Sequence, residues 1–205
     1  KIRSVRVIVG TTSTLMSRPF LFAIKSFSLA VIDEAGQITE PNIVGLLATH
    51  TAGADPQQLI GRFILVGDYK QLPAVVQQSE QESAVDDALL LEAGIRNCRD
   101  SLFERLIRHE RASGREQFIG ILQRQGRMHP DIAEFPNTMF YFHEHLRPVP
   151  LPHQQQPSLP YALPSDDTLD DVLKQHRMVF IPSAPCHTAG SSDKVNTAEA
   201  AIVAD

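Results

Sequence analysis

Cysteine and tryptophan are scarce in this 205-residue sequence, which has two cysteines and no tryptophan. Cys98 and Cys186 are too few for a disulfide framework, and neither lies in a CxxC or Cys/His ligand spacing. A structural zinc site is therefore not expected. Apolar runs are also short, and none approaches the roughly 18 residues that a membrane-spanning helix needs. We expect a soluble, intracellular monomer, cytoplasmic or nuclear, without a membrane partner.

A phosphate-binding loop of the form GxxxxGK[ST] is missing as well, because none of the 11 glycines is followed by lysine. Such a loop surrounds phosphate groups with backbone amides and adds a lysine. The net charge is −5, whereas proteins that coat nucleic acid need clustered lysine and arginine. Global charge therefore neither supports nor excludes a nucleic-acid partner.

Short stretches rich in Val, Ile, Leu and Phe predict β-strands at 5–9, 29–32, 63–66 and 178–181, with a fifth candidate at 118–122. Several are almost wholly apolar, which is typical of strands covered on both faces. Helical patterns lie between them, at 41–48, 84–93, 101–109, 130–141 and 197–204. This order predicts an α/β fold with mainly parallel sheets.

Two features divide the chain. The polar stretch 110–117, which contains glycine, separates the first three strands from the rest and predicts an interdomain link. We therefore expect one domain over 1–112 and another over 113–205. Six of the 14 prolines fall within 148–164 and indicate an extended loop. The chain opens almost directly into a strand and stops within a helical pattern, which suggests a piece of a larger protein.

The first segment that could carry chemistry is VIDEAGQITEP, residues 31–41. An apolar strand ends there in Asp33 and Glu34, and ligands of α/β sheets bind at the carboxyl ends of strands. In one interpretation Asp33 helps to hold Mg²⁺ through water and Glu34 polarises the water that attacks a γ-phosphate. In the other, the pair is only a polar strand end leading into a turn.

The second segment, FILVGDYKQLPAVV at 63–76, repeats this design. Gly67 allows a tight backbone turn after the strand, and the Gln71 amide can donate to phosphate and accept from water. Gln71 could therefore sense a γ-phosphate. A Gly-Asp turn followed by a proline that stops the element is the equal alternative.

The third segment is LQRQGRMHPDIAEFPNTMFY, residues 122–141. Arg127 lies where a short strand meets a helix that begins at Pro130, so its rigid, charged guanidinium could enter a neighbouring site. A surface ion pair is the alternative for an isolated arginine. We interpret His129 as a turn or capping residue rather than a metal ligand, because His143 and His145 fit no ligand pattern with it.

The order and spacing of the three segments resemble motifs II, III and IV of superfamily 1 helicases. The likeness is to the 5′-to-3′ branch with the RNA-surveillance (nonsense-mediated decay) and Okazaki-processing enzymes, over motifs Ic to IV. SLFERL at 101–106 and KVNTAEAAIV at 194–203 extend it. VIVGTTSTL at 7–15 is similar to the family's segment that grips the nucleic-acid backbone, although a strand followed by Ser/Thr turn residues is equally compatible.

The resemblance implies two partial RecA-like P-loop NTPase domains in an ATP-dependent helicase that moves along single-stranded DNA or RNA, with Mg²⁺ as cofactor. Asp33 and Glu34 would be the Walker B pair and Gln71 the sensor of motif III, while Arg127 would reach the γ-phosphate from the second domain. The residues implied in nucleotide binding are Gly67, Asp68, Gln71, Gln125 and Arg127. Those implied in nucleic-acid binding are Thr11, Thr12 and Pro73.

Two departures from the family pattern matter. Gly126 stands where the family usually has an aromatic residue that stacks on adenine, so adenine preference stays open. Without a phosphate-binding loop, we expect this polypeptide alone not to hydrolyse ATP. Two alternatives to a helicase also stay open. One is a non-catalytic nucleic-acid or protein binding module with a degenerate NTPase fold, and the other is a motor ATPase fused to a nuclease.

Overall fold

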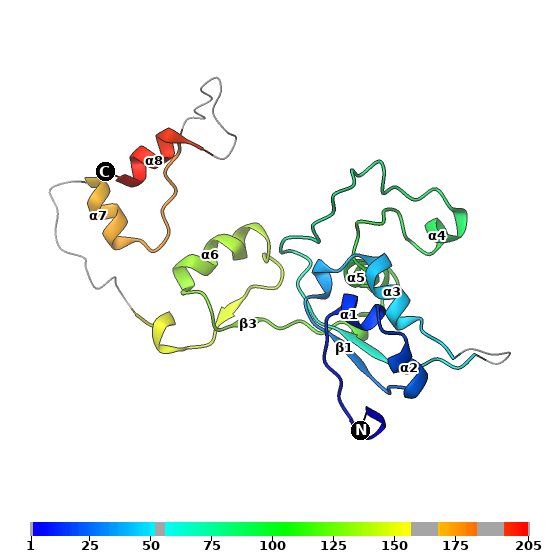
Figure 1. The fold of residues 1–205 in the computed structure, drawn as a ribbon. Helices are drawn as coiled ribbons and strands as arrows, with labels where there is room; N and C mark the ends of the chain where they lie inside the picture. The colour runs from blue at the N-terminus through cyan, green and yellow to red at the C-terminus, as the bar shows by residue number, and fades with distance from the viewer. Residues whose placement is uncertain (1, 52–55, 157–167, 184–194, 205) are drawn as a thin grey trace. The chain divides into compact units, whose positions relative to one another are not determined.

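The computed structural model describes residues 2–51, 56–156, 168–183 and 195–204, which fold within two compact units, 1–120 and 121–205 (Figure 1). The first unit contains α1 (Thr12–Met16), α2 (Phe20–Ile24), β1 (Ala30–Ile32), α3 (Glu40–Leu47), β2 (Phe63–Leu65), α4 (Ala88–Glu92), α5 (Leu102–Ala112) and 3-10 turns at Ile2–Ser4, Ala35–Gln37 and Glu116–Phe118. The second contains β3 (Arg124–Gln125), α6 (Pro130–Met139), β4 (Arg147–Pro148), α7 (Thr168–Gln175), α8 (Thr197–Ala204) and a 3-10 turn at Pro152–Gln154.

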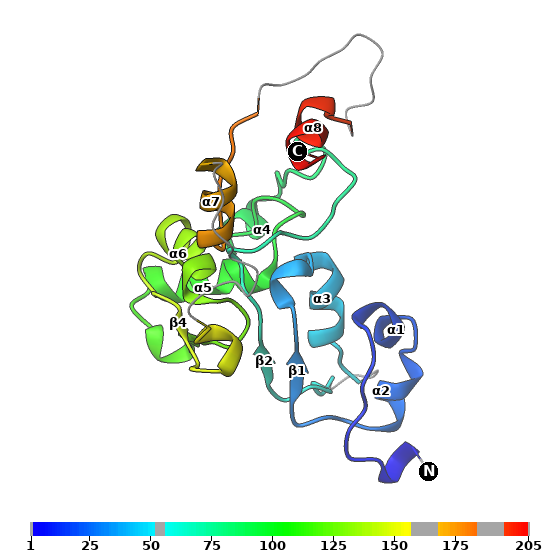
Figure 2. The same ribbon diagram turned by 90° about the vertical axis from the view of Figure 1, so that its left-hand side faces the viewer.

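The first unit is built around the parallel pair β1 and β2, in which Ile32 lies opposite Leu65. The two strands run side by side, with α3 beside β1 (Figure 2). Parallel strands need a crossover connection, and α3 lies on the crossover between them. Both strands were predicted from their apolar runs, and both are confirmed.

The core of the first unit lies between β1, α3 and the start of α5. Its buried hydrophobic residues are Phe22, Ile32, Ala35, Ile43, Leu46, Leu47, Leu59, Ile60 and Leu102. Ile43 and Ala35 each expose only 1% of their surface. Ala35 directly follows Asp33 and Glu34 at the end of β1. Because Ala35 is packed in the core, the position of these two acidic residues at the end of the strand is fixed.

Helix α5 has well-defined ends. Ser101 caps its start, because the Oγ of Ser101 accepts a hydrogen bond from the Glu104 N–H at 3.2 Å. After its end Gly114 adopts a φ of 68°, a left-handed conformation that favours glycine. Arg115 then donates through Nε and a terminal NH₂ group to the carboxylate of Glu110, at 2.8 and 2.7 Å. This hydrogen bonding lowers the pKa of Glu110 below its ordinary value of 4.5.

The second unit pairs β3 with β4 in parallel and places α6 after β3. Pro130 begins α6, as predicted. Proline suits this position because the amide groups of the first helical turn have no partner within the helix, so the missing N–H of proline costs no hydrogen bond. The Nδ1 of His129 accepts from the Asp131 N–H at 3.2 Å, so the predicted capping role of His129 is confirmed. Among the described residues of this unit, Ala133 and Gln154 are the ones that are buried.

Three strand predictions were wrong. Residues 5–9, 118–122 and 178–181 form no strands, and Val9 and Phe180 expose 91% and 88% of their surface. A strand requires a hydrogen-bonded neighbour, and the described residues pair none with these segments. The helix expected at 84–93 is confined to α4, and the predicted boundary between domains after 112 stays a prediction.

Candidate active site

Asp33 and Glu34 leave the carboxyl end of β1 as an exposed pair. The Glu34 N–H donates to Oδ1 of Asp33 at 3.0 Å, and Glu34 has a left-handed backbone with φ 51° and ψ 36°. For a residue other than glycine this conformation costs about 1–3 kcal/mol and persists only where the surroundings enforce it. Here the next N–H, of Ala35, donates to the Val66 carbonyl at 2.8 Å and holds the turn to the end of β2.

The backbone of Gly67 lies directly against this turn. A Cβ atom at Gly67 would approach the backbone nitrogens of Ala35 and Gly36 to 3.0 Å each. The close approach of two chain segments therefore explains why glycine is needed at this position. The backbone turn does not require it, because the φ of Gly67 is not positive and any residue could adopt it. The ends of β1 and β2 consequently form one continuous edge of the first unit.

Asp68 organises the residues that follow Gly67. One oxygen of its carboxylate accepts from the Lys70 N–H at 3.0 Å, and the other accepts from the Gln71 side-chain amide at 3.1 Å. This is a turn in which an aspartate side chain binds the backbone two residues later. The exposed Gln71 side chain is thereby held beside Asp68 at the same edge as Asp33 and Glu34.

One further residue at this edge was missed by the sequence analysis. The amide of Gln37 donates to the Glu34 carboxylate at 3.4 Å. The signal was present in VIDEAGQITEP, because a glutamine three residues after a glutamate in a single helical turn can reach back to it. Gln37 therefore orients the carboxylate that is the candidate base.

In the second unit, Gln125 and Arg127 share a fixed loop. The Gln125 side chain accepts from the Arg127 and Met128 amides at 2.9 and 2.7 Å and donates to the Met128 carbonyl at 2.8 Å. The buried Gln154 amide donates to the carbonyls of Gln125 and Met128, at 3.0 and 2.8 Å. Gln125 thus shapes the loop, whereas the exposed Arg127 guanidinium forms no hydrogen bond or ion pair within the described chain.

Gly126 lies under the 3-10 turn that contains Gln154. A Cβ atom at Gly126 would come within 3.2 Å of Cδ1 of Leu151, and the Gly126 carbonyl lies 3.0 Å from Nε2 of His153. A larger residue at this position requires Leu151 to move. The packing of Leu151 against Gly126 therefore leaves no room for an aromatic side chain at this position.

The candidate nucleic-acid residues lie in two places in the first unit. Thr11 caps the five-residue helix α1, since its Oγ1 accepts from the Thr14 N–H at 3.2 Å, and Thr12 is half-buried. Pro73 lies in an exposed segment after Gln71, where Leu72 exposes 83% of its surface. Thr11 and Pro73 are both open to solvent, but the Thr11 hydroxyl already has a structural partner.

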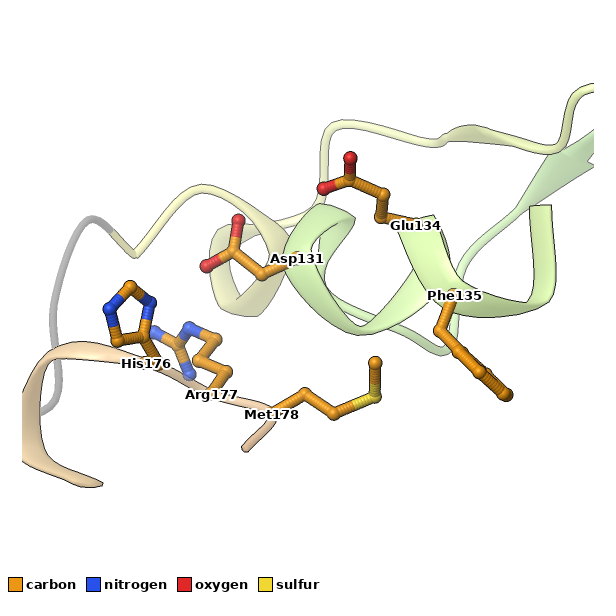
Figure 3. A pocket seen from close by; sticks show the side chains of 6 residues that line it. All are labelled: Asp131, Glu134, Phe135, His176, Arg177 and Met178. Atoms are coloured by element: carbon orange, nitrogen blue, oxygen red, sulfur yellow. The ribbon is translucent and has the colours of Figure 1, made fainter. Parts of the chain in front are cut away.

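The described residues of the second unit also line two pockets, and neither includes Gln125 or Arg127. The first measures about 460 Å³ and is drawn in Figure 3; Asp131, Glu134 and Phe135 extend from α6, and His176, Arg177 and Met178 come from the segment after α7. The second, about 480 Å³, lies between α6 and the segment around Phe142 and Leu146. The described part of the chain has no group of three or more His, Cys, Asp or Glu side chains that could hold a metal ion.

Parallel strands that end in paired carboxylates and a Gly-Asp turn, inside an α/β unit, are typical of RecA-like nucleotide-binding domains, and the fold class predicted from the sequence is confirmed. The sequence matches two family models, both described as an AAA domain, over residues 2–79 and 98–205. The chain belongs to the AAA domain family.

Several curated proteins are similar to this chain. The DNA replication ATP-dependent helicase/nuclease JHS1 of Arabidopsis thaliana is 33% identical over 141 residues, which are 69% of this chain and 8% of that protein. DNA2 of Mus musculus, with the same description, is 31% identical over 134 residues, 65% of this chain and 10% of that protein. An uncharacterized ATP-dependent helicase of Methanocaldococcus jannaschii is 33% identical over 135 residues, 66% of this chain and 16% of that protein.

The matches confirm the resemblance to superfamily 1 helicases that the three motifs predicted. The chain spans only 8% and 10% of the length of the first two relatives. Among the residues that the structure describes, no helix combines the length and the apolar character needed to cross a membrane.

Proposed function

We propose that this chain forms part of an ATP-dependent helicase that moves along single-stranded DNA or RNA. The observation that carries the proposal is the contact of Gly67 with the backbone of Ala35 and Gly36, which joins the two strand ends into one edge. That edge presents Glu34 and Gln71 to solvent. The names of the similar helicases support the same reaction class. We further propose a monomer that acts in the cytoplasm or the nucleus.

In this proposal Glu34 polarises the water that attacks the γ-phosphate, and Gln37 keeps its carboxylate oriented. Gln71, already held by Asp68, senses the γ-phosphate, and Gly67 contributes to the nucleotide site by packing against Ala35 and Gly36, which keeps the two strand ends together. Arg127 supplies positive charge from the second unit on the loop that Gln125 shapes. Both sets of residues are proposed to act on the same triphosphate.

Asp33 fits a role in holding Mg²⁺. Its carboxylate is exposed, and protein sites for Mg²⁺ commonly use one or two carboxylates together with water and phosphate oxygens. Bound Mg²⁺ would neutralise charge on the β- and γ-phosphates. The phosphate-binding loop that completes such a site has no counterpart within these 205 residues, so hydrolysis is proposed for the complete protein.

For the nucleic acid we propose backbone contacts from Thr11, Thr12 and Pro73. Hydroxyl and amide groups of the two threonines can position a strand through its phosphates without reading its sequence, and Pro73, which has no N–H, would contribute only a packing contact. The Thr11 hydroxyl accepts from the Thr14 N–H and donates to the Thr14 hydroxyl at 2.9 Å, so a contact with a phosphate oxygen would require its hydrogen to turn away from Thr14.

The test of the ATPase proposal is Glu34→Gln in the complete protein. We expect nucleic-acid-stimulated ATP hydrolysis to fall by about 10²–10⁴-fold, since the amide cannot accept a proton from water. ATP binding, measured by nucleotide fluorescence titration, should persist, because Gln keeps the size of Glu. Unchanged hydrolysis would remove the role assigned to Glu34, whereas a complete wild-type protein that hydrolyses no ATP would favour a binding module.

A motor ATPase attached to a nuclease is the second candidate, and the helicase/nuclease names of two relatives favour it. A strand-displacement assay on the complete protein separates the two candidates. Substrates with 5′ or 3′ overhangs, in DNA and in RNA, should be unwound by a helicase, and we expect the 5′ overhang to be required. ATP hydrolysis with strand cleavage and without displacement would support the motor–nuclease instead.

A further inference from the structure

The most deeply buried charged group in the described structure is Glu40, which exposes 4% of its surface. Glu40 begins α3, six residues after Glu34. Its carboxylate accepts two hydrogen bonds from Arg105 of α5, from Nε at 2.7 Å and from a terminal NH₂ group at 2.5 Å. A buried carboxylate is unfavourable unless it is paired and hydrogen-bonded, and the two-pronged guanidinium satisfies both conditions.

Arg105 also joins further segments to this pair. Its other terminal NH₂ group donates to the Ala93 carbonyl at 2.8 Å. The Glu40 N–H in turn donates to the Asp100 carbonyl at 2.8 Å, next to the bridge between Thr39 and Ser101. The segment that begins with Asp33 and Glu34 is therefore held to the first part of α5 by side-chain hydrogen bonds and to Asp100, just before this helix and its cap, by a backbone hydrogen bond.

A second arginine of α5 reaches the other segment of the candidate active site. Arg111 donates to the hydroxyl of Tyr69 at 2.9 Å, and its guanidinium carbon lies 6.0 Å from the centre of the Tyr69 ring. Tyr69 lies between Asp68 and Gln71 in the segment after β2. One helix therefore contacts both segments that carry the candidate catalytic side chains.

We propose that α5 is the positioning element of the candidate active site, with Arg105 holding the segment after β1 through Glu40 and Arg111 holding the segment after β2 through Tyr69. This inference rests on the proposed ATPase function. Buried ion pairs are weak evidence for stability, because well-packed apolar residues often stabilise as much. Their fixed geometry suits a role in placing Glu34 and Gln71, neither of which Arg105 or Arg111 touches.

The test uses Glu40→Gln, Arg105→Lys and Arg111→Gln in the complete protein, with Arg108→Gln as the matched control. Arg108 lies on the same helix and pairs only with Glu104 in the described structure, on the surface. Single-turnover ATP hydrolysis gives two readouts. The amplitude reports the fraction of molecules that are folded and bind ATP, and the rate constant reports the placement of groups in those that remain.

We expect each of the three variants to lower the single-turnover rate constant, by up to about 10²-fold for Glu40→Gln and Arg105→Lys, because small misplacements of reacting groups have effects of that size. Arg105→Lys should fail to rescue, since lysine keeps the charge but lacks the planar fork. Arg108→Gln should match the wild-type protein in both rate constant and amplitude.

The outcomes separate the two levels of the proposal. If Glu34→Gln abolishes hydrolysis while the three variants keep the rate constant of Arg108→Gln and lose only amplitude, α5 is merely structural and the positioning proposal is wrong. If Glu34→Gln leaves hydrolysis intact, the assignment of Glu34 and its strand end to the ATPase site is wrong, and if the complete wild-type protein hydrolyses no ATP, the ATPase function itself is wrong. Should both buried-pair variants fail to fold, the exposed Arg111→Gln decides, and a wild-type rate constant for it overturns the proposal.

Discussion

At the scale of single residues, Gly67 makes the clearest energetic prediction. In Gly67→Ala the added methyl would lie 3.0 Å from the backbone nitrogens of Ala35 and Gly36, and backbone atoms cannot rotate away as a side chain can. The two strand ends must therefore separate. We expect the free energy of unfolding of the first unit to fall by about 1–3 kcal/mol, as for other over-packed sites, measured by urea denaturation of the complete protein.

Gly120→Ala is the matched control for this prediction. It introduces the same methyl group at a glycine whose Cβ position has no heavy atom within 4 Å. Its stability should stay the same or rise by about 0.4–1 kcal/mol, because alanine reduces the freedom of the unfolded chain. Equal unfolding curves for the two variants would show that the strand ends are not packed as tightly as the structure has them.

The sequence predicted which polar residues follow each strand of the candidate site, because Asp33 and Glu34 come directly after one apolar run and Gln71 lies five residues after the end of another. It did not predict what holds them. Gln125, expected to contact nucleotide, has a side chain engaged in its own loop. Hydrogen bonds of this kind depend on how the loop folds back on itself. The order of residues alone does not show which groups of the loop come within hydrogen-bonding distance.

At the scale of elements, local signals located the longer helices well. A serine cap and a following glycine mark α5, and Pro130 marks the start of α6. The five-residue helices α1 and α2 were not predicted, since they are shorter than two turns and show no apolar periodicity. The eight-residue α7 was missed as well.

Strands were harder to predict because pairing is not a local property. The runs at 5–9 and 29–32 look alike in the sequence, yet only the second has a neighbouring strand in the described structure. The pair that forms is itself only partly covered, as Val31 and Ile64, which lie opposite each other, expose 63% and 50% of their surfaces. An apolar run indicates that a segment can be buried by other parts of the protein. Whether the segment forms a strand depends on whether another strand lies beside it and pairs with it.

At the scale of the whole molecule, contacts between residues distant in sequence hold the segments of the candidate active site to α5, and these contacts could not be predicted. Glu40 and Arg105 lie 65 positions apart, and Tyr69 and Arg111 lie 42 apart. The motif order nevertheless placed Glu34 and Gln71 in the first unit and Arg127 in the second, without any knowledge of these contacts. The proposed role of Arg127 in hydrolysis is therefore the part of the proposal that most needs a test.

Arg127→Ala and Arg127→Lys test that dependence in the complete protein. An arginine that reaches a transferring phosphoryl group contributes about 10³–10⁵-fold to the rate, so we expect Arg127→Ala to lose hydrolysis on that scale while keeping nucleic-acid binding. Arg127→Lys should recover little, because one ammonium cannot replace a planar guanidinium with several donors. Steady-state ATPase assays with saturating single-stranded nucleic acid measure both effects.

Arg124→Lys provides the comparison, since Arg124 is an exposed arginine of the same unit on β3, three residues before Arg127. It should hydrolyse ATP at the wild-type rate. If Arg127→Ala does so too, its guanidinium does not reach the phosphates, and the second unit contributes no charge to the reaction. The role proposed for Arg127 would then be wrong, and the proposed hydrolysis would depend on Glu34 and Gln71 of the first unit alone.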